Sequence, residues 1–332
     1  MNIAFLGSGA WGTALGSLLC GNGHRVMLWS QDAELAHLIN TTHQHPKLPG
    51  LEIHPALRAS CDLAEVMASA EVICEAVTSA GIRPVCEELK QMGVAPMPLI
   101  MTSKGIEQHT GLLLPEVAID VLGEEWRDWI GLLSGPSYAE EVLRRIPTVV
   151  VAAAYGEAQR QRIVQLFSSP LFRVYPNADL KGVGFGGAMK NIIAIAAGTS
   201  DGLGFGMNTK AALMTRGLHE MRKLAAANGA LPDTLNGLSG MGDLMLTCFS
   251  PLSRNYRFGG LLAQGLSPQE AKEQIGMAVE GAYTCLSAYE LARKSHVAVP
   301  VIDTVYDLLE HGMPPQEAVE RLMARTIKEE TL

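Results

Sequence analysis

Short apolar runs with β-strand character alternate with helical patterns over the first half of the chain. Asn2–Leu6 is followed by a helical stretch, 13–19, and then by a second apolar run, Arg25–Trp29. Further strands are expected at 72–77, 98–103, 129–133, 148–154 and 172–175, and helices at 62–70, 79–91, 112–121 and 157–167. Repeated β-α units predict a largely parallel, doubly wound sheet, with ligands beyond the carboxyl ends of its strands.

The pattern changes to a helical period after Asn177. Helices are expected at 182–198, 208–228, 254–264, from Ser267, at 282–294 and on each side of 312–315, with a capping box formed by Ser267 and Glu270. Two loops are expected to interrupt them, a flexible glycine-rich turn at 237–243 and a second loop at 250–255. The sequence therefore predicts an α/β protein in which a Rossmann-type dinucleotide-binding domain, 1–176, precedes an all-α substrate domain, 177–332.

Length and composition narrow the class of protein. The chain has 332 residues, enough for two domains, and a formal net charge of −8, which argues against general binding to nucleic acid or to an anionic membrane. The six cysteines include no C-x-x-C pair, and His43, His45 and Cys61 do not have metal-ligand spacing. We expect a cytoplasmic protein with reduced thiols and no metal.

The strongest single motif is Gly7-Ser-Gly-Ala-Trp-Gly12, which lies between the first strand and the first helix. Gly7 permits a tight turn, Gly9 lets backbone amides approach a pyrophosphate, and Gly12 lets the helix pack on the strand. The end of the second strand offers Ser30 and Gln31 for a ribose hydroxyl or a 2′-phosphate, and Asp32, which is equally suited to cap a helix. The motif predicts NADP or NAD as cofactor, with a slight preference for NADP.

The segment 182–198 contains one charged side chain, that of Lys190. Its helical neighbours are small or apolar, so another backbone can approach closely and little water can follow. An isolated buried ammonium is costly. Lys190 is either a structural lysine satisfied by a carboxylate and carbonyls, or a proton donor and acceptor facing a substrate.

Other candidates lie at strand ends and in the two expected loops. Lys104 and the turn 135–137 follow predicted strands, and Asp243 lies in the glycine-rich turn. Ser253, Arg254 and Asn255 begin a predicted helix, where free N–H groups, a guanidinium and an amide are suited to phosphate. An ordinary N-cap with a solvated arginine explains the same residues.

Together these motifs resemble the bacterial NAD(P)-dependent sn-glycerol-3-phosphate dehydrogenases along nearly the whole chain. The segments that carry the resemblance are 7–14, Thr102-Ser-Lys-Gly105, Ser134-Gly-Pro-Ser137, Gly187-Ala-Met-Lys-Asn191, Gly240-Met-Gly-Asp-Leu244, Ser253-Arg-Asn255 and Val279-Glu-Gly281. The resemblance implies that Lys190 transfers the proton. It places Lys104, Gly135, Ser137, Asp243, Ser253, Arg254 and Asn255 around the substrate, and Ala10, Trp11, Lys104, Ala139, Arg254, Val279 and Glu280 against the cofactor.

The implied reaction is the reversible reduction of dihydroxyacetone phosphate to sn-glycerol 3-phosphate, which feeds glycerophospholipid synthesis. The implied assembly is a homodimer. The chain departs from the family's pattern at Gln31, where a basic residue is frequent, and at Val77-Thr-Ser79 and Lys47, which lie in loops on the cofactor side. The alternatives are a dehydrogenase of similar build that acts on a hydroxy acid, and a catalytically silent dinucleotide sensor in which Lys190 is structural.

Overall fold

The chain forms two compact units. The computed structural model describes residues 1–326 and residue 329. The first unit contains residues 1–103 and 114–180, and the second contains residues 104–113 and 181–332. The segment Lys104–Leu113 therefore leaves the first unit after a strand and belongs to the helical one.

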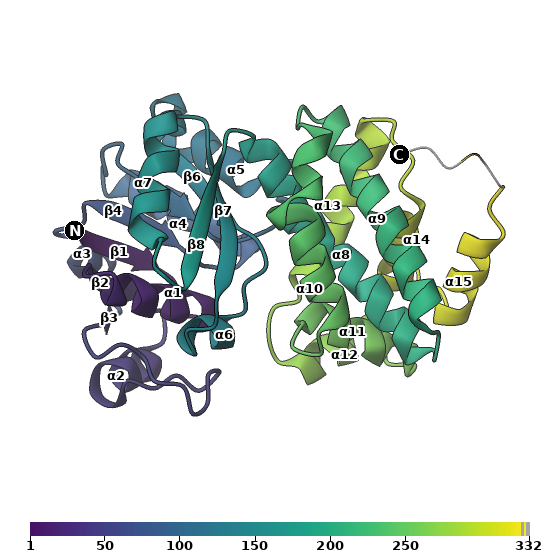
Figure 1. The fold of residues 1–332 in the computed structure, drawn as a ribbon, viewed down its shortest axis with the longest axis horizontal. Helices are drawn as coiled ribbons and strands as arrows, with labels where there is room; N and C mark the ends of the chain where they lie inside the picture. The colour runs from purple at the N-terminus through teal and green to yellow at the C-terminus, as the bar shows by residue number, and fades with distance from the viewer. Residues whose placement is uncertain (327–328, 330–332) are drawn as a thin grey trace. The chain divides into compact units, whose positions relative to one another are not determined.

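Within the described residues, the first unit is built on an eight-stranded sheet of order β3-β2-β1-β4-β5-β6-β7-β8 (Figure 1). The strands are β1 (Asn2–Leu6), β2 (Arg25–Trp29), β3 (Arg58–Ser60), β4 (Val72–Glu75), β5 (Leu99–Met101), β6 (Ile130–Ser134), β7 (Thr148–Ala154) and β8 (Phe172–Asn177). Neighbouring strands are parallel except β6 and β7, which are antiparallel. The prediction of a largely parallel, doubly wound sheet is confirmed.

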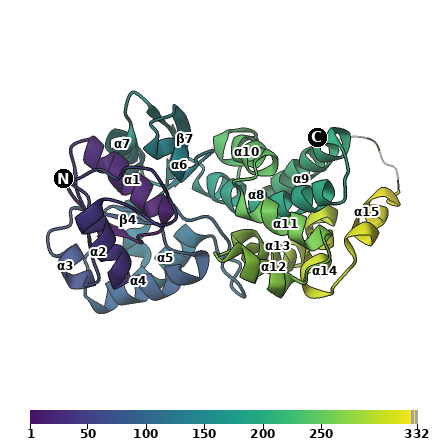
Figure 2. The same cartoon turned by 90° about the horizontal axis from the view of Figure 1, so that it is seen from below.

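Helices cover both faces of this sheet. They are α1 (Ala10–Gly21), α2 (Ala33–Thr42), α3 (Leu63–Met67), α4 (Ile82–Gln91), α5 (Leu114–Leu122), α6 (Ala139–Leu143) and α7 (Glu157–Phe167), with 3₁₀ turns η1 (Ser79–Gly81) and η2 (Glu124–Trp129). Figure 2 shows α1 and α7 on one side of the sheet and α4 and α5 on the other. The core beneath α1 and α7 includes Phe5, Leu15 and Phe167, all fully buried.

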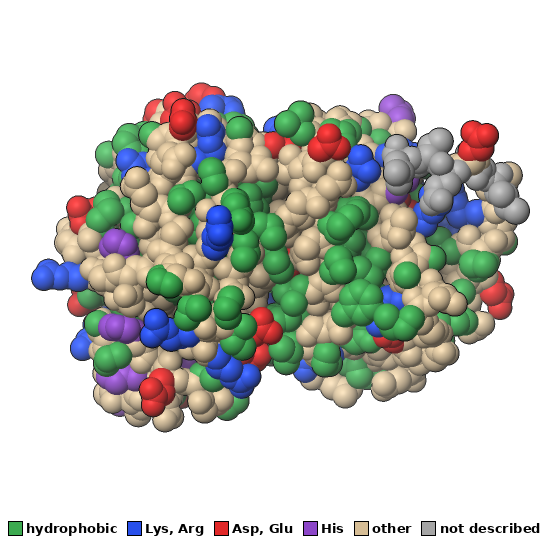
Figure 3. All heavy atoms as spheres, in the orientation of Figure 1, with side chains coloured by type: hydrophobic (Ala, Val, Ile, Leu, Met, Phe, Trp, Pro, Cys, Tyr) green, Lys and Arg blue, Asp and Glu red, His purple; other side chains and the backbone are tan. Residues whose placement is uncertain are grey.

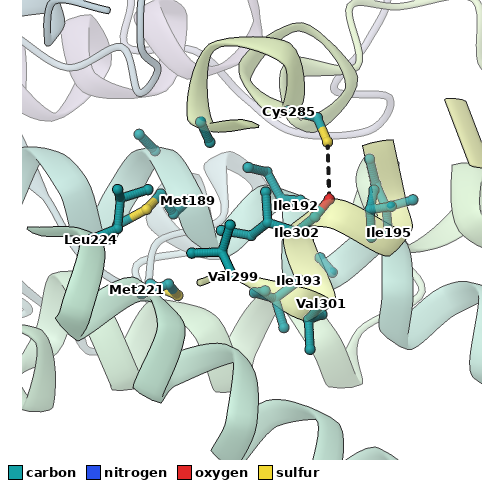
Figure 4. Close-up of a cluster of buried hydrophobic side chains, with 14 of the residues drawn as sticks. Met189, Ile192, Ile193, Ile195, Met221, Leu224, Cys285, Val299, Val301 and Ile302 are labelled. Carbon is teal, nitrogen blue, oxygen red and sulfur yellow. Dashed lines mark hydrogen bonds between the residues drawn. The ribbon is translucent and has the colours of Figure 1, made fainter. Parts of the chain in front are cut away.

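The second unit contains an isolated β-bridge between Ile106 and Leu113, but its regular elements in the described residues are all helical. Its elements are α8 (Leu180–Gly202), α9 (Met207–Ala227), η3 (Pro232–Asn236), η4 (Leu238–Gly242), α10 (Asp243–Phe249), α11 (Arg254–Ala263), α12 (Pro268–Ile275), α13 (Glu280–Lys294), α14 (Pro300–Glu310) and α15 (Pro315–Met323). The capping box predicted at Ser267 is present at the start of α12. Figure 4 shows the core, in which Ile192 and Ile193 of α8 pack with Met221, Val299 and Ile302.

Glycines on α8 allow other backbones to pack directly against it, as the sequence predicts. A Cβ at Gly186 would lie 2.8 Å from the carbonyl oxygen of Ser239, and one at Gly198 would lie 1.9 Å from that of Tyr256. The only side chain that fits at either position is therefore a hydrogen atom. These contacts press η4 and α11 against the face of α8 near Lys190.

The prediction of a flexible glycine-rich turn at 237–243 is wrong. That stretch is a π-helical turn, η4, which runs directly into α10, and Asp243 begins this helix with 1% of its surface exposed. A Cβ at Gly240 would lie 2.0 Å from the carbonyl oxygen of Leu235. Gly240 therefore serves close packing, and Asp243 lies in a continuous helical segment.

Candidate active site

The glycine motif forms the turn between β1 and α1 in the first unit. Gly7 has a φ of +115°, and a Cβ there would lie 2.6 Å from the carbonyl oxygen of Ala76. A Cβ at Gly12 would lie 2.2 Å from the carbonyl oxygen of Gly7, whereas nothing lies within 4 Å of a Cβ at Gly9. Gly9 also precedes α1 without a side-chain cap. The start of α1 therefore has open space at Gly9, which fits a dinucleotide pyrophosphate.

The end of β2 settles the roles of two neighbours of Gln31. Ser30 is buried, accepts a hydrogen bond from Ser8 at 2.7 Å and donates one to the backbone oxygen of Asp32. Asp32 caps α2 by accepting from the N–H groups of Glu34 and Leu35, both at 3.0 Å. Gln31 and Asp32 are both exposed, but the carboxylate of Asp32 already caps α2.

The turn after β6 contains three further candidates. Gly135 has a φ of +133°, and a Cβ there would touch Val150 at 3.0 Å. Ser137 donates a hydrogen bond to the carbonyl oxygen of Gly135 at 3.1 Å, and Ala139 begins α6, which packs on α1. The structure thus places Gly135, Ser137 and Ala139 in the first unit with the glycine loop.

A buried cluster of charged side chains lies in the second unit. Lys190 of α8 donates hydrogen bonds to Oδ1 of Asp243 and to Oγ1 of Thr247, both at 2.7 Å. Lys104 contacts the other carboxylate oxygen of Asp243 at 2.6 Å. Thr247 in turn donates to the backbone oxygen of Asp243 at 2.6 Å. Two ammonium groups therefore contact one carboxylate in a mostly buried place.

The environment shifts the pKa values of this cluster in opposite directions. Burial lowers the pKa of Lys190 from 10.5 to about 8, with a contribution from the charge of Lys104, although Asp243 opposes the shift. Burial also acts to raise the pKa of Asp243, but the two neighbouring ammonium groups outweigh it and hold that pKa below its ordinary value. Lys190 is thus an ammonium at neutral pH that releases its proton more readily than a solvated lysine.

The start of α11 lies next to this cluster along a chain of hydrogen bonds. Asn191, which follows Lys190, accepts from Nδ2 of Asn255 at 3.0 Å, and Oδ1 of Asn255 accepts from the N–H of Gly281 at 2.9 Å. Ser253 caps the helix by accepting from the N–H of Tyr256 at 3.2 Å. The predicted helix start is therefore confirmed as a local structure.

Arg254 and the start of α13 complete the group in the second unit. Arg254 donates from Nη1 to the carbonyl oxygen of Ala278 at 3.1 Å, next to Val279 and Glu280. A Cβ at Gly281 would lie 2.5 Å from the carbonyl oxygen of Asn191. The 279–281 segment therefore packs closely on the residue that follows Lys190.

Sequence reasoning missed two members of this group, Thr247 and Asn191. Thr247 lies four residues after Asp243, so a helix over 243–249 places both on one face. That helix was not predicted, because the preceding glycines indicated a turn. Asn191 was adjacent to the central lysine, but only the structure shows its bond to Asn255.

The remaining candidates do not form a metal centre. Nε2 of His45 contacts the backbone oxygen of Ser8 at 3.0 Å, and Nδ1 accepts from the N–H of Lys47. No cluster of three or more metal-ligating side chains occurs among the described residues, and no helix in residues 1–326 is long and apolar enough to cross a membrane. His45 instead fastens its loop to the glycine turn.

A glycine-rich turn lies at the carboxyl end of β1, and a separate helical unit holds a buried lysine of lowered pKa. Together these features define a two-unit oxidoreductase of the NAD(P)-dependent class. Comparison with known proteins makes this specific. Residues 2–160 match the family described as NAD-dependent glycerol-3-phosphate dehydrogenase N-terminus, and residues 179–320 match the corresponding C-terminus. The chain belongs to the NAD-dependent glycerol-3-phosphate dehydrogenase family.

Relatives similar over the full length agree with this family. The chain is 53% identical over 330 residues to glycerol-3-phosphate dehydrogenase [NAD(P)+] of Protochlamydia amoebophila, and 50% identical to that of Chlamydia caviae, with 99% of each chain covered in both cases. The crystal structure of glycerol-3-phosphate dehydrogenase from Coxiella burnetii superposes with a TM-score of 0.92 at 37% identity, covering 97% of this chain and 98% of that one. The predicted family, fold and NAD(P) class are confirmed.

Proposed function

We propose that this protein reduces dihydroxyacetone phosphate to sn-glycerol 3-phosphate, reversibly, with NADH or NADPH. The observation that carries the proposal is the buried cluster in which Lys190 and Lys104 share Asp243. Its two ammonium groups suit an anionic substrate. Its central ammonium, with a pKa lowered to about 8, suits proton transfer near neutral pH.

Lys190 is the proton donor in the direction of reduction. A bound NADH or NADPH would supply the hydride that reduces the ketone at C2, a reaction in which negative charge develops on the carbonyl oxygen. The ammonium of Lys190 stabilises that charge and delivers the proton. Asp243 and Thr247 orient the ammonium through their 2.7 Å hydrogen bonds, and Lys104 fixes the substrate's oxygens beside it.

The start of α11 binds the substrate phosphate. Ser253 and Asn255 make the structural bonds described above, which orient Arg254 and leave the second N–H of the Asn255 amide for the ligand. Charge-assisted bonds from a guanidinium and from the N–H groups of a helix start are strong for phosphate. Binding this non-reacting group positions the carbonyl for reaction. Gly135 and Ser137 are also assigned to the substrate.

The cofactor is assigned to the glycine loop and its neighbours. Gly7, Gly9 and Gly12 shape the turn, and the space open at Gly9 fits the pyrophosphate. The full set of cofactor residues is Gly7, Gly9, Ala10, Trp11, Gly12, Gln31, Lys104, Ala139, Arg254, Val279 and Glu280. Because Ser30 and Asp32 have other partners, discrimination between NAD and NADP falls to Gln31.

A substrate panel tests the proposal. Oxidation of NADH and of NADPH is followed with dihydroxyacetone phosphate, with unphosphorylated dihydroxyacetone and with a 2-keto acid. We expect turnover with the phosphorylated ketone. Preference for the keto acid would favour a hydroxy-acid dehydrogenase, and no turnover with any substrate despite cofactor binding would favour a sensor.

Two variants test the residue roles. Lys190→Ala should reduce kcat severely while the protein still binds NADH, and near-normal turnover would refute its role in proton transfer.

Arg254→Ala should reduce kcat/KM for dihydroxyacetone phosphate by about 10- to 100-fold, as expected for a charged hydrogen bond worth about 1.5–3 kcal/mol. An equal loss with unphosphorylated dihydroxyacetone would refute the phosphate role.

The proposal extends to assembly and setting. Exposed apolar side chains include Met207 of α9 and Met245 and Phe249 of α10, and Figure 3 shows hydrophobic side chains on one face of the helical unit, which supports a homodimer that light scattering can test. The six cysteines, which form no disulfide, fit a reducing cytoplasm. The product, sn-glycerol 3-phosphate, is then available for phospholipid synthesis. The net charge of −8 is unsuited to nucleic acid.

A further inference from the structure

A buried glutamate at the carboxyl end of β4 has no role in the reaction proposed above. Glu75 is 2% exposed and lies in register with Leu6 of β1 and Met101 of β5. The strand order reverses between β1 and β4, because β2 and β3 extend from one side of β1 and β4 begins the other. Glu75 therefore lies at the switch point of the sheet, where ligands of such folds bind.

The side chain of Glu75 ties the ends of β4 and β5 together. Its Oε1 accepts from the N–H of Val77 at 2.5 Å and lies 2.6 Å from Oγ of Ser103, which also contacts the carbonyl oxygen of Val77. The backbone oxygen of Glu75 accepts from N and Oγ1 of Thr102, at 3.0 and 2.7 Å. One residue thus connects the loop after β4 with the residues that precede Lys104.

A count of hydrogen atoms favours a neutral carboxylic acid. Ser103 Oγ lies within hydrogen-bond distance of Oε1 of Glu75 and of the carbonyl oxygen of Val77. If Glu75 is ionised, both of these atoms are acceptors, but Ser103 has a single hydroxyl hydrogen to donate. A proton on Oε1 of Glu75 resolves this conflict, because Glu75 then donates to Ser103 and Ser103 donates to Val77. The other oxygen, Oε2, is buried with no partner among the described residues, which is costly for a carboxylate and cheaper for a neutral carbonyl.

The surroundings of Glu75 agree with this protonation state. Successive side chains of a strand alternate, so Glu75 points away from Cys74 towards the side covered by α4 and α5. The buried side chains of those helices are apolar except the thiol of Cys86. Burial raises the pKa of Glu75 to about 7, although hydrogen bonds from Ser103, Val77 and Thr102 oppose the shift.

We propose that Glu75, held as a neutral carboxylic acid, is a positioning residue that fixes Ser103 and so the backbone from which Lys104 extends to Asp243. The same bonds fix Val77, next to the carbonyl of Ala76 that packs against Gly7. The inference rests on the proposed role of Lys104 in substrate binding. Loosening Ser103 displaces the ammonium of Lys104, and small displacements of positioning groups cost large factors in rate.

Infrared difference spectroscopy tests the protonation state directly. The parent protein should show the C=O stretch of a protonated carboxylic acid at about pH 6 that weakens by about pH 8, on either side of the pKa of about 7. Glu75→Gln should lack that band, and this loss assigns the band to Glu75 and not to another buried acid. If the parent protein shows no such band at about pH 6, or if its band persists in Glu75→Gln, the neutral state of Glu75 is refuted.

Kinetics test the positioning role. Glutamine at position 75 cannot both accept from Val77 and donate to Ser103 through one atom, so Glu75→Gln should lower kcat/KM for dihydroxyacetone phosphate by about 10- to 100-fold. The dissociation constant for NADH should change less. Ser103→Ala should have the same effect, and the double variant should be no worse than either single one, because both break the same link.

Two comparison variants keep the outcomes distinct. Glu220→Gln alters another buried glutamate, which accepts from the N–H groups of Val301 and Ile302, and should leave kcat/KM per folded molecule unchanged. Lys104→Ala should lower kcat/KM. Parent-like kinetics in Glu75→Gln and Ser103→Ala, with Lys104→Ala impaired, would overturn the positioning role. An unimpaired Lys104→Ala would instead refute the proposed role of Lys104.

Discussion

Replacing Lys190 with methionine should stabilise the protein while abolishing its turnover. Methionine has nearly the length of lysine without the ammonium, so the surrounding apolar packing of α8 is retained. Asp243 keeps Lys104 as its partner at 2.6 Å, so the change does not leave an unpaired buried carboxylate. The variant therefore removes a buried charge without creating another.

The magnitude follows from the pKa of Lys190. A folded-state pKa of about 8, against 10.5 for the ordinary group, means that folding opposes the charged form by about 3 kcal/mol, at about 1.4 kcal/mol per pKa unit. The unfolded chain binds the proton more tightly, so the stability of the parent should rise between about pH 8 and about pH 10.5. Below about pH 8 the full penalty applies. Lys190→Met should be more stable there by up to about 3 kcal/mol and should lack this rise.

Urea denaturation at several pH values measures the effect. We expect a higher midpoint for Lys190→Met at neutral pH, a slope unchanged from the parent and curves that converge at high pH. Lys210→Met is the matched control for turnover, because Lys210 is a second buried lysine of this unit, paired with Asp201, that we assign no role in the reaction. A Lys190→Met protein less stable than the parent at neutral pH would refute the reasoning, since the ammonium would then be a net stabilising group.

Three further outcomes follow from the same structure. Raising the pH through about 8 should lower kcat/KM for ketone reduction and raise it for alcohol oxidation, because Lys190 of the unliganded site changes from proton donor to acceptor; pH profiles of kcat/KM in both directions check this. Glu220→Gln should cost about 1–3 kcal/mol in thermal or urea unfolding, because one of the two N–H groups that begin α14 loses its acceptor. Gly186→Ala should cost about 1–3 kcal/mol and most of the turnover by pushing η4 away from α8, whereas Gly21→Ala, which meets open space, should be tolerated in both assays.

Local sequence signals were sufficient for the fold of the first unit. Strands and helices there have clear periodicity, and the glycine turn lies between a strand and a helix as its chemistry requires. No helix was predicted at α2 (Ala33–Thr42), although Asp32 was noted as a possible cap, and two short elements were missed: β3 has three residues and α6 has five. Such segments carry too few positions for a period to emerge, and neighbouring strands decide their conformation.

The candidate site was harder to predict because its members meet through tertiary packing. The sequence identified Lys190 as an isolated charge and Asp243 as a carboxylate, but glycines near Asp243 indicated a mobile turn. Their actual role, close approach of η4 to α8 and to Leu235, depends on which backbone lies opposite. No local pattern contains that information, which is why Asp243 was placed in the wrong kind of structure and Thr247 was missed.

Because Asp243 pairs with both Lys104 and Lys190, the charge of one lysine acts on the other. A second carboxylate beside Lys190 would raise the pKa of Lys190 towards its ordinary value. With Asp243 shared, the charge of Lys104 lowers the pKa of Lys190. An arriving phosphate ester brings negative charge and should raise that pKa again, so we expect Lys190 to be more fully protonated when the ketone is bound. Substrate binding and protonation of the donor are therefore thermodynamically linked, and the affinity for dihydroxyacetone phosphate should fall as the pH rises above about 8.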